Sequence, residues 1–306
     1  MQEKIMTDII VIGAGAAGMT AALYALRNGH SVTIIEKNNI GGQISESPRV
    51  ENFPTIKTIS GAELADKLFE QITELGVEFK FGEVTSLKKV DGEFVVTTEY
   101  DTFTSKAVIV AAGVGHRKLN LPREDELIGN GISYCALCDG AFYKDSEVVL
   151  IGDGNTALQY ALLLSSITRG VHVVTLFDKF FGDASLVSAL NKKQNIKVTH
   201  NAKLVELVGD KALSGLIFEK ADGTKLTIAT PALFVAIGQV PNNNVFSHLV
   251  ELTADGYIVA DENMATKTPG LFVAGDCRNK KVRQLTTACS DGAVAATIAC
   301  NYLESL

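Results

Sequence analysis

Cys135 and Cys138 are the residues of this chain whose types and spacing point most directly to chemistry. They form a Cys-Ala-Leu-Cys motif that is followed by Asp139 and Gly140. Two thiols at this spacing can close a small disulfide, and an adjacent carboxyl group can carry the proton that dithiol chemistry requires. We predict that Cys135 and Cys138 form a redox-active disulfide, with Asp139 as the candidate acid/base.

Half of a zinc site is the structural alternative for this motif. A closed zinc site needs a second Cys-x-x-Cys or paired histidines. The sequence offers neither, because its five histidines are scattered and Cys277, Cys289 and Cys300 are isolated. We therefore predict no metal site and interpret Cys289 and Cys300 as small core residues.

A glycine-rich turn near the N-terminus predicts a nucleotide site. The motif Gly-Ala-Gly-Ala-Ala-Gly at residues 13–18 joins a predicted strand at residues 8–12 to a predicted helix at residues 16–27, and Glu36 closes the next strand. In such a turn the glycines allow a close backbone approach to a pyrophosphate, and the acidic residue accepts hydrogen bonds from a ribose.

A second copy of this plan begins at residue 148. The motif Gly-Asp-Gly-Asn-Thr-Ala at residues 152–157 lies between a predicted strand at residues 148–151 and a helix at residues 156–164, and another strand is expected at residues 171–177. Two nucleotide-binding units thus occupy one chain.

The rest of the chain fits an α/β fold with two Rossmann-like domains, the second inserted into the first. We expect one domain to comprise residues 1–115 and 243–306, and the other, which contains the disulfide motif, to comprise residues 116–242. Further elements are predicted as helices at residues 61–75 and 286–302 and strands at residues 77–79, 94–97, 108–111, 233–237, 257–259 and 271–274.

Composition narrows the classes of partner. The net charge of -7 over 306 residues provides no general basic field for nucleic acid or an anionic membrane surface. The N-terminus does not have the pattern of a secretory signal, and no stretch of about 20 residues is continuously apolar. We expect a cytoplasmic protein.

In combination, these motifs resemble the low-molecular-weight thioredoxin reductases over essentially the whole chain. The resemblance rests on several landmarks in matching order, at residues 13–18, 41–43, 51–54, 111–113, 135–140, 152–157, 236–238, 274–276 and 283–284. It implies FAD as the cofactor, thioredoxin as the acceptor and a homodimer. It also implies that Cys138 faces the flavin, that Cys135 attacks the partner disulfide, and that Asp139 is the acid/base.

The resemblance makes residues 1–115 and 243–306 the FAD-binding domain, with FAD between the first glycine turn and the C-terminal segment. It makes residues 116–242 the disulfide-containing, NAD(P)-binding-like domain. Asp276 is expected to hold the ribityl and pyrophosphate region, and Gln43, Asn52 and Gln284 to lie near the ring system. The residues expected to bind FAD are Gly13, Gly15, Ala16, Ala17, Gly18, Glu36, Lys37, Gly41, Gly42, Gln43, Asn52, Val84, Ala112, Gly113, Gly275, Asp276, Arg283, Gln284 and Leu285.

The chain departs from NADPH-dependent members of this family after the second unit's strand. Those relatives carry arginines there, because guanidinium groups hold a 2′-phosphate well. We place the corresponding positions here at Lys179 or Phe180 and at Ala184, with Asp178 beside them. This pattern resembles the ferredoxin-dependent flavin thioredoxin reductases, and we predict reduced ferredoxin or flavodoxin as the electron donor.

Three other functions remain open. The intact turn at residues 152–157 allows an NADH- or NADPH-driven reductase. A dithiol oxidase would pass electrons to oxygen, and a flavin-containing redox sensor would change a binding surface.

Basic residues at 278–283 could steer an acidic ferredoxin, with Lys280 and Lys281 as the test positions, or could form an ordinary solvated loop.

Overall fold

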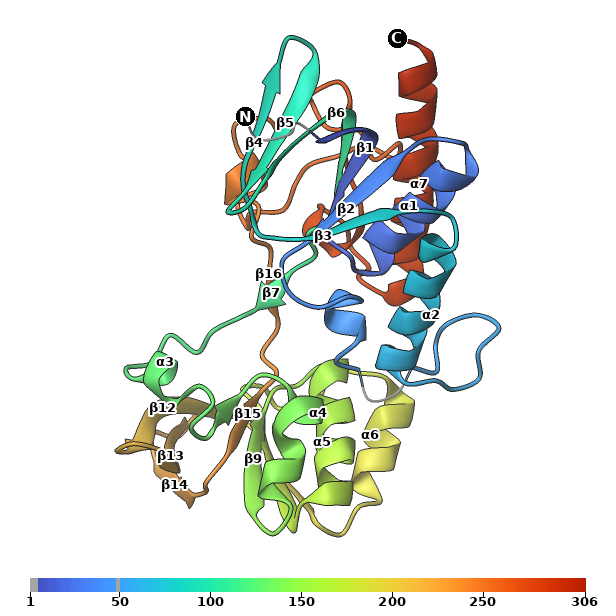
Figure 1. Cartoon of the computed structure of the whole chain (residues 1–306). Helices are drawn as coiled ribbons and strands as arrows, with labels where there is room; N and C mark the ends of the chain where they lie inside the picture. The colour runs from blue at the N-terminus through green and yellow to red at the C-terminus, as the bar shows by residue number, and fades with distance from the viewer. Residues whose placement is uncertain (1–4, 48–49) are drawn as a thin grey trace. The chain divides into compact units, whose positions relative to one another are not determined.

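The computed structural model describes residues 5–47 and 50–306, without the side chains of Ile5 and Cys138. It divides the chain into two compact units (Figure 1). Unit 1 comprises Met1–Gly115 and Val240–Leu306, and unit 2 comprises His116–Gln239. The second crossing between the units follows Gln239, whereas sequence analysis placed it after residue 242.

A seven-stranded sheet forms the centre of unit 1, in the order β3-β2-β1-β6-β5-β4, with β17 also paired to β6. Strands β3, β2, β1, β6 and β17 run parallel to one another, whereas β5 and β4 form an antiparallel extension. The strands are β1 (Ile5–Ile12), β2 (Val32–Glu36), β3 (Glu78–Phe81), β4 (Val84–Val90), β5 (Glu93–Thr98), β6 (Thr102–Val110) and β17 (Leu271–Val273).

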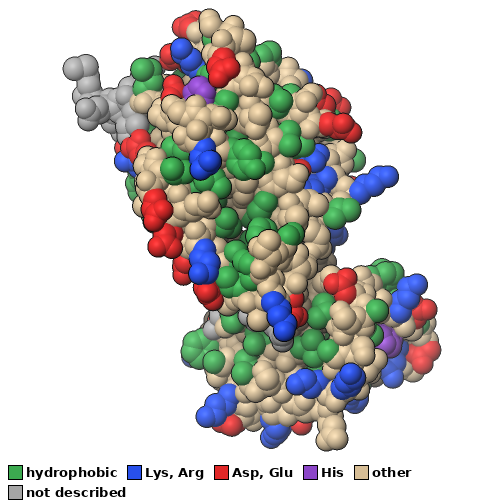
Figure 2. Space-filling view, turned by 90° about the vertical axis from the view of Figure 1, so that its right-hand side faces the viewer, with side chains coloured by type: hydrophobic (Ala, Val, Ile, Leu, Met, Phe, Trp, Pro, Cys, Tyr) green, Lys and Arg blue, Asp and Glu red, His purple; other side chains and the backbone are tan. Residues whose placement is uncertain are grey.

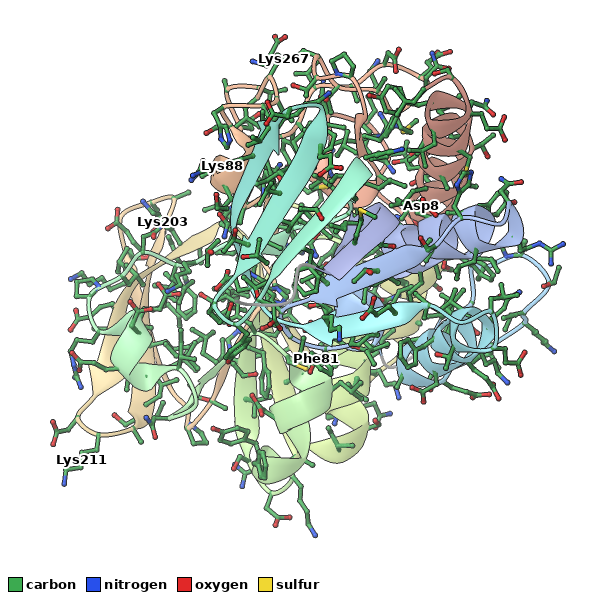
Figure 3. The ribbon with its side chains drawn as sticks, turned by 45° about the horizontal axis from the view of Figure 1, so that its top comes forward. Asp8, Phe81, Lys88, Lys203, Lys211 and Lys267 are labelled. Carbon is green, nitrogen blue, oxygen red and sulfur yellow. The ribbon has the colours of Figure 1, made fainter. Side chains whose placement is uncertain are left out.

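The central strands of this sheet are apolar on both faces. Ile9 and Val11 of β1 pack in one core cluster, whereas Ile10 and Ile12 pack in another on the opposite side. Such continuous apolar runs are typical of buried parallel strands. The edge strands are more exposed: β3 ends at Phe81, which is 59% exposed, and β4 exposes Lys88 (Figure 3). A lysine on an edge strand discourages pairing with another sheet.

Two helices of unit 1 pack unusually closely because small residues face each other. Helix α1 (Ala16–Arg27) buries Ala17, Ala21 and Ala25 at a spacing of four residues, in the same core cluster as the buried alanines of α7 (Leu285–Glu304). The remaining helical segments of this unit are α2 (Gly61–Thr73) and the 3-10 turns η1 (Gly42–Ile44), η3 (Asn244–Phe246) and η4 (Gly275–Cys277).

Unit 2 contains a smaller parallel sheet in the order β11-β10-β9-β15-β8. Its strands are β8 (Ile132–Ser133), β9 (Glu147–Ile151), β10 (Gly170–Val174), β11 (Ile196–Thr199) and β15 (Leu233–Val235). Its helical segments are α3 (Glu124–Leu127), α4 (Ala136–Asp139), η2 (Gly140–Tyr143), α5 (Asn155–Ile167) and α6 (Ala184–Asn191).

A separate antiparallel sheet in unit 2 consists of β12 (Ala202–Gly209), β13 (Leu213–Lys220) and β14 (Lys225–Ala229). The chain crosses between the units in two short strands, β7 (Gly115–His116) and β16 (Gln239–Val240), which form a two-stranded sheet. Both charge signs are scattered over the face shown in Figure 2.

The predicted α/β class with two nucleotide-binding-type units is confirmed, and two of the expected strands differ most from the structure. Strand β10 ends at Val174, not at residue 177, because the Thr175 hydroxyl bonds the Phe177 carbonyl at 2.7 Å and turns the chain. The expected strand at residues 257–259 is reduced to isolated bridges at Ile258, next to the turn at Gly256, whose φ is 83°.

Gly292 tests the close approach of α1 and α7. A Cβ at this position would lie 2.2 Å from the Ala17 carbonyl oxygen. In an open helix Gly→Ala stabilises by about 1 kcal/mol, but here the clash decides the sign. We expect Gly292→Ala to lower the free energy of unfolding by about 1–3 kcal/mol.

Urea unfolding checks this expectation, with Ser290→Ala as the control because Ser290 is exposed on the same helix. Ser290→Ala should leave stability unchanged or slightly increased. A Gly292→Ala protein as stable as the control would show that the helices can separate without cost.

Candidate functional site

The first glycine turn brings the end of β1 into direct contact with the end of β6. Gly13 has φ 107°, and a Cβ there would lie 2.3 Å from the Ala111 carbonyl oxygen. At Gly18 a Cβ would lie 1.9 Å from the Gly13 carbonyl oxygen. Both glycines are required by close packing, and Gly15 caps α1 without a side chain that would cover the helix N-terminus. This backbone arrangement suits a pyrophosphate.

Glu36 is buried at the end of β2, where it shapes the same turn. Its Oε2 accepts a hydrogen bond from the Ala14 amide at 2.7 Å, and its Oε1 accepts one from Asn38 at 2.8 Å. A carboxylate has about four acceptor positions, so capacity for ribose hydroxyls remains. The neighbouring Lys37 lies nearer the surface, with its ammonium 3.4 Å from Glu83, the residue before Val84.

Segments distant in the sequence meet around this turn. Gly41 pairs with Gly15 in an isolated bridge, and Gly42 lies against Gly15 as well. The Gln43 side chain donates to the Val114 carbonyl at 2.6 Å, close to Ala112 and Gly113. Asn52 donates to Gln284 at 3.1 Å, although 232 positions separate them.

The C-terminal segment completes the site with a tight turn, η4. Gly275 has φ 80°, and a Cβ there would lie 2.8 Å from the Ala17 Cβ, so the turn lies directly on α1. Arg283 donates to the Asp276 carbonyl at 3.3 Å and stacks 4.0 Å from the Tyr257 ring centroid. Gln284 forms a capping box with Thr287 at the start of α7, and Leu285 packs on the cluster around Val50.

Asp276 supplies the observation that tests the fit of a cofactor. Its Oδ1 is buried and has no hydrogen-bond partner among the described residues, and burial raises the pKa of this carboxyl group. Buried polar atoms are normally paired, so such an oxygen marks a place for a ligand hydroxyl. Together with the glycine turn and Glu36, this donor and acceptor set fits a dinucleotide such as FAD.

The three isolated cysteines are not placed for disulfide chemistry. Cys277 is fully buried behind the η4 turn, and burial raises the pKa of its thiol to about 12. Cys289 and Cys300 are free thiols on α7 whose pKa values are also raised by burial. A thiol in such surroundings stays protonated and is a poor nucleophile. The interpretation of Cys289 and Cys300 as packed residues agrees with their positions.

In unit 2, Cys135 is disulfide-bonded and precedes the short helix α4. Its backbone is fixed by Ser133, whose Oγ accepts from the Cys135 amide at 3.0 Å and donates to the Cys135 carbonyl at 3.1 Å. The Cys138 side chain lies outside the described part of the structure. Asp139 is half-buried at the end of α4, with Gly140 packed against the α5 side chains.

A buried carboxylate that sequence analysis missed secures the residue before Cys135. Glu124 accepts hydrogen bonds from the Leu119 and Asn120 amides at 3.0 and 2.7 Å, and the Tyr134 hydroxyl donates to the same carboxylate. Burial raises the pKa of the Tyr134 hydroxyl, and the hydrogen bond to Glu124 raises this pKa further. The crossing segment and the cysteine motif are therefore tied together within unit 2.

The second glycine turn repeats the geometry of the first. Gly152 has φ 144°, and a Cβ there would lie 2.2 Å from the Ala236 carbonyl oxygen. The segment after β10 folds back onto this turn, since the Phe181 amide donates to the Asp153 carbonyl at 2.7 Å and the Asp183 amide to Asn155 Oδ1 at 2.6 Å.

The residues that directly follow β10 differ from those expected. Because β10 ends at Val174, residues 175–177 follow the strand directly, whereas Lys179, Phe180 and Ala184 lie further along the chain. Leu176 and Phe177 are 55% and 49% exposed, and Phe177 meets Phe181 edge to face at 5.3 Å. The Lys179 ammonium lies 5.5 Å from the Phe181 ring centroid.

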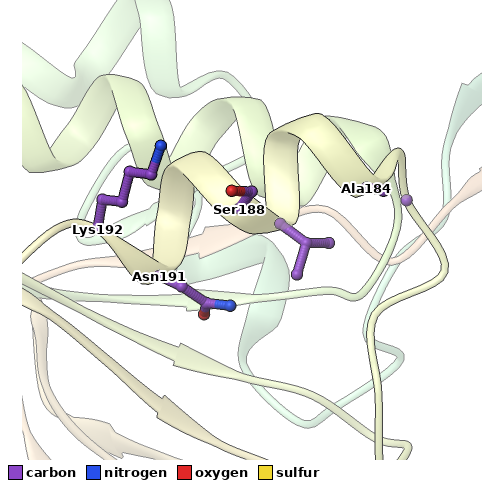
Figure 4. A pocket seen from close by; sticks show the side chains of 6 residues that line it. Ala184, Ser188, Asn191 and Lys192 are labelled. Atoms are coloured by element: carbon purple, nitrogen blue, oxygen red, sulfur yellow. The ribbon is translucent and has the colours of Figure 1, made fainter.

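A hollow of about 620 Å³ lies beside α6, lined by Gly182, Ala184, Val187, Ser188, Asn191 and Lys192 (Figure 4). None of the residues predicted to bind FAD or to form the disulfide lines it. Within the described part of the chain, no three His, Cys, Asp or Glu side chains gather to hold a metal ion. No described helix has the length and apolar character to cross a membrane.

The two Rossmann-like units, the glycine turns and the disulfide define a nucleotide-dependent disulfide oxidoreductase. The chain belongs to the pyridine nucleotide-disulphide oxidoreductase family, whose model matches residues 7–292. It is a flavin disulfide oxidoreductase with FAD as its cofactor.

Relatives within this family are similar along their full length. A thioredoxin reductase from Listeria monocytogenes is 38% identical over 309 residues, which cover 100% of this chain and 96% of the relative. The solved thioredoxin reductase from Lactococcus lactis is 35% identical, with a TM-score of 0.95 and coverage of 98% and 100%.

A solved ferredoxin-flavin thioredoxin reductase from Clostridium acetobutylicum is more distant. It is 28% identical with a TM-score of 0.54, over 99% of this chain and 100% of that one. The resemblance to the ferredoxin-dependent branch is therefore not favoured by overall similarity. The homodimer and the ferredoxin donor stay predictions.

Tyr134 tests the tie between the crossing segment and the cysteine motif. Tyr134→Phe leaves the buried Glu124 carboxylate with one hydrogen bond fewer, and we expect the free energy of unfolding to fall by about 1–3 kcal/mol. Tyr143→Phe is the matched control in the same unit, since its hydroxyl forms no hydrogen bond with the described residues. Denaturant unfolding measures both, and equal losses would contradict the role of Glu124.

Proposed function

We propose that the protein is a thioredoxin reductase in which unit 1 holds FAD and the Cys135/Cys138 pair of unit 2 reduces thioredoxin. The observation that carries this proposal is the combination of a disulfide at Cys135 with a cofactor-shaped site around Asp276. The similarity to proteins named thioredoxin reductase over nearly their whole length supports it.

The residues proposed to bind FAD fall into three groups. The turn at residues 13–18 would lie against the pyrophosphate, and Glu36 would accept from the adenosine ribose. Asp276 would accept from a ribityl hydroxyl through its unpartnered Oδ1. Gln43, Asn52 and Gln284 would contact the ring system, and the hydrogen bond between Asn52 and Gln284 would change when they do so.

When bound, FAD supplies storage of two electrons and their release to a disulfide. In the reduced chain, the Cys135 thiolate attacks the thioredoxin disulfide, which forms an intermolecular disulfide and releases one thioredoxin thiolate. The Cys138 thiolate then attacks the Cys135 sulfur, which releases the second thioredoxin thiolate and restores the disulfide of the chain. Two electrons pass to thioredoxin, and Asp139 carries one of the two protons.

For the electron donor, we propose reduced ferredoxin or flavodoxin in place of NADPH. The supporting observation is the exposed apolar surface of Leu176 and Phe177 directly after β10. A 2′-phosphate carries nearly two negative charges and needs cationic hydrogen-bond donors. The nearby Asp178 would repel it, and Lys179 lies over the Phe181 ring instead.

The basic segment expected to steer such a donor is only partly available at the surface. Lys280 was expected to be a surface charge, but its side chain is 6% exposed and its ammonium lies 2.9 Å from Asp291. A buried, paired ammonium attracts a distant partner only weakly. Lys280 is therefore excluded as a steering residue, whereas Lys281 is exposed.

A nicotinamide nucleotide is the second candidate donor. The turn at Gly152 keeps the close approach to Ala236 that a dinucleotide fold needs. The similar thioredoxin reductases from Listeria monocytogenes and Lactococcus lactis are not named as ferredoxin-dependent. An unphosphorylated adenosine would not require the missing arginines, and Asp178 could accept from its 2′-hydroxyl.

Anaerobic flavin absorbance distinguishes these donors. NADPH, NADH and enzymatically reduced ferredoxin are added in turn to the full-length holoenzyme, and oxidised thioredoxin is added last. We expect bleaching with ferredoxin alone and recovery of absorbance with thioredoxin. Prompt bleaching by NADPH or NADH would overturn the ferredoxin proposal while leaving the thioredoxin reductase proposal intact.

Phe142 tests the thioredoxin proposal. This side chain is 82% exposed in η2, four positions after Cys138, and Leu137 within the motif is 39% exposed. Large exposed apolar groups next to a reactive disulfide suit a protein partner. We expect Phe142→Ala to raise KM for thioredoxin by about tenfold without changing kcat, because a docking contact is lost.

The matched control is Phe81→Ala, because Phe81 is an aromatic side chain of unit 1 that is 59% exposed. It should leave KM for thioredoxin unchanged. If both variants, or neither, changed KM, Phe142 would have no specific role in docking.

A further inference from the structure

A buried charge cluster lies behind the η4 turn, and it centres on Asp291 of α7. Asp291 is 5% exposed. Its Oδ2 accepts hydrogen bonds from the Gly275 amide at 3.1 Å, from Arg278 Nε at 2.8 Å and from Lys280 Nζ at 2.9 Å. Its Oδ1 accepts from Arg278 Nη2 at 3.0 Å. One carboxylate thus holds both ends of the segment from Gly275 to Lys280.

This segment carries Asp276, the residue with the unpartnered oxygen. The Lys280 ammonium lies 3.8 Å from Asp276 Oδ1, beyond hydrogen-bond distance, whereas it donates a hydrogen bond to Asp291 Oδ2 at 2.9 Å. Two carboxylates therefore compete for one buried ammonium group. Asp291 holds it at the shorter distance, and Asp276 Oδ1 keeps its free acceptor position.

We propose that Asp291 is a positioning residue for FAD binding, which holds Lys280 away from Asp276 and fixes the η4 turn on α1. None of the sequence motifs described above includes Asp291. Its position in an otherwise apolar helix is the signal that could have drawn attention to it, because Asp291 and Glu304 are the only charged residues of α7.

The energetic argument follows from burial. An ammonium group removed from water needs a carboxylate or several hydrogen bonds. If Asp291 loses its charge, the nearest remaining carboxylate for Lys280 is that of Asp276. A movement of the Lys280 ammonium by about 1 Å would bring it within hydrogen-bond distance of Asp276 Oδ1. The Asp276 acceptor proposed for the cofactor would then be occupied, and its charge would be neutralised.

The experiment measures the FAD dissociation constant of the full-length chain after removal of the cofactor, by quenching of flavin fluorescence. We expect Asp291→Asn to weaken FAD binding by about tenfold or more, because one partner of a buried charge pair is removed. Lys280→Met should stay within about threefold of the wild type, since Lys280 is not itself a ligand in this arrangement.

The double variant Asp291→Asn/Lys280→Met separates positioning from simple loss of structure. Without the lysine, Asp276 Oδ1 is free again, and the double variant should bind FAD several times more tightly than Asp291→Asn alone. A purely structural role for Asp291 predicts that the second substitution restores nothing. Lys281→Met is the control, because Lys281 is exposed two positions from Arg283.

Two outcomes would overturn the proposal. One is a double variant that binds FAD no more tightly than Asp291→Asn. The other is a loss of tenfold or more in Lys280→Met, which would make Lys280 a direct ligand; this result is decisive even if Asp291→Asn fails to fold. FAD affinity is measured without turnover, so neither outcome depends on the proposed donor or on thioredoxin.

Discussion

The contact between a glycine turn and the end of the neighbouring strand governs the architecture of both units. In unit 1 the Gly13 backbone lies against the Ala111 carbonyl, and in unit 2 Gly152 lies against the Ala236 carbonyl. No side chain fits at either place, because a Cβ would approach the oxygen to 2.3 or 2.2 Å. The turn can therefore pass over the carboxyl ends of the parallel strands, and the helix that follows begins with its amide groups facing the same edge.

This constraint explains why much of the fold could be predicted from the sequence. A glycine turn between an apolar run and an alanine-rich segment is a local pattern, and it specifies a strand, a turn and a helix together. The α1 boundaries at Ala16 and Arg27 match those expected. The cysteine motif is equally local. The end of β10 was harder to place, because the apolar run continues through Leu176 and Phe177 after the ladder with its neighbours has stopped.

The parts that could not be predicted depend on contacts between distant residues. Glu124 is an ordinary acidic residue in the sequence, yet the fold buries it against Tyr134 and two backbone amides. Lys280 lies in a basic stretch that is typical of a solvated loop. In the fold its ammonium group is buried and paired with the carboxylate of Asp291 on α7. Burying a charge is favourable only with a partner in place, and the partner is fixed by tertiary packing, which no local pattern contains.

The two nucleotide-type units share their backbone but differ in the side chains at the second strand. In unit 1, β2 ends in Glu36, a buried carboxylate held by two amides of its own turn. In unit 2, β10 is followed by exposed Leu176 and Phe177, and the segment beyond them is bonded to the glycine turn itself. The first arrangement places a carboxylate with remaining acceptor capacity at the end of the second strand, whereas the second places apolar surface just after the corresponding strand. Because the Gly152 turn also packs unit 2 together through Ala236, its glycine would be required by the fold whether or not a nucleotide binds there. An intact glycine turn is therefore weaker support for a nucleotide ligand in unit 2 than in unit 1, and the side chains after the second strand carry more information about the electron donor.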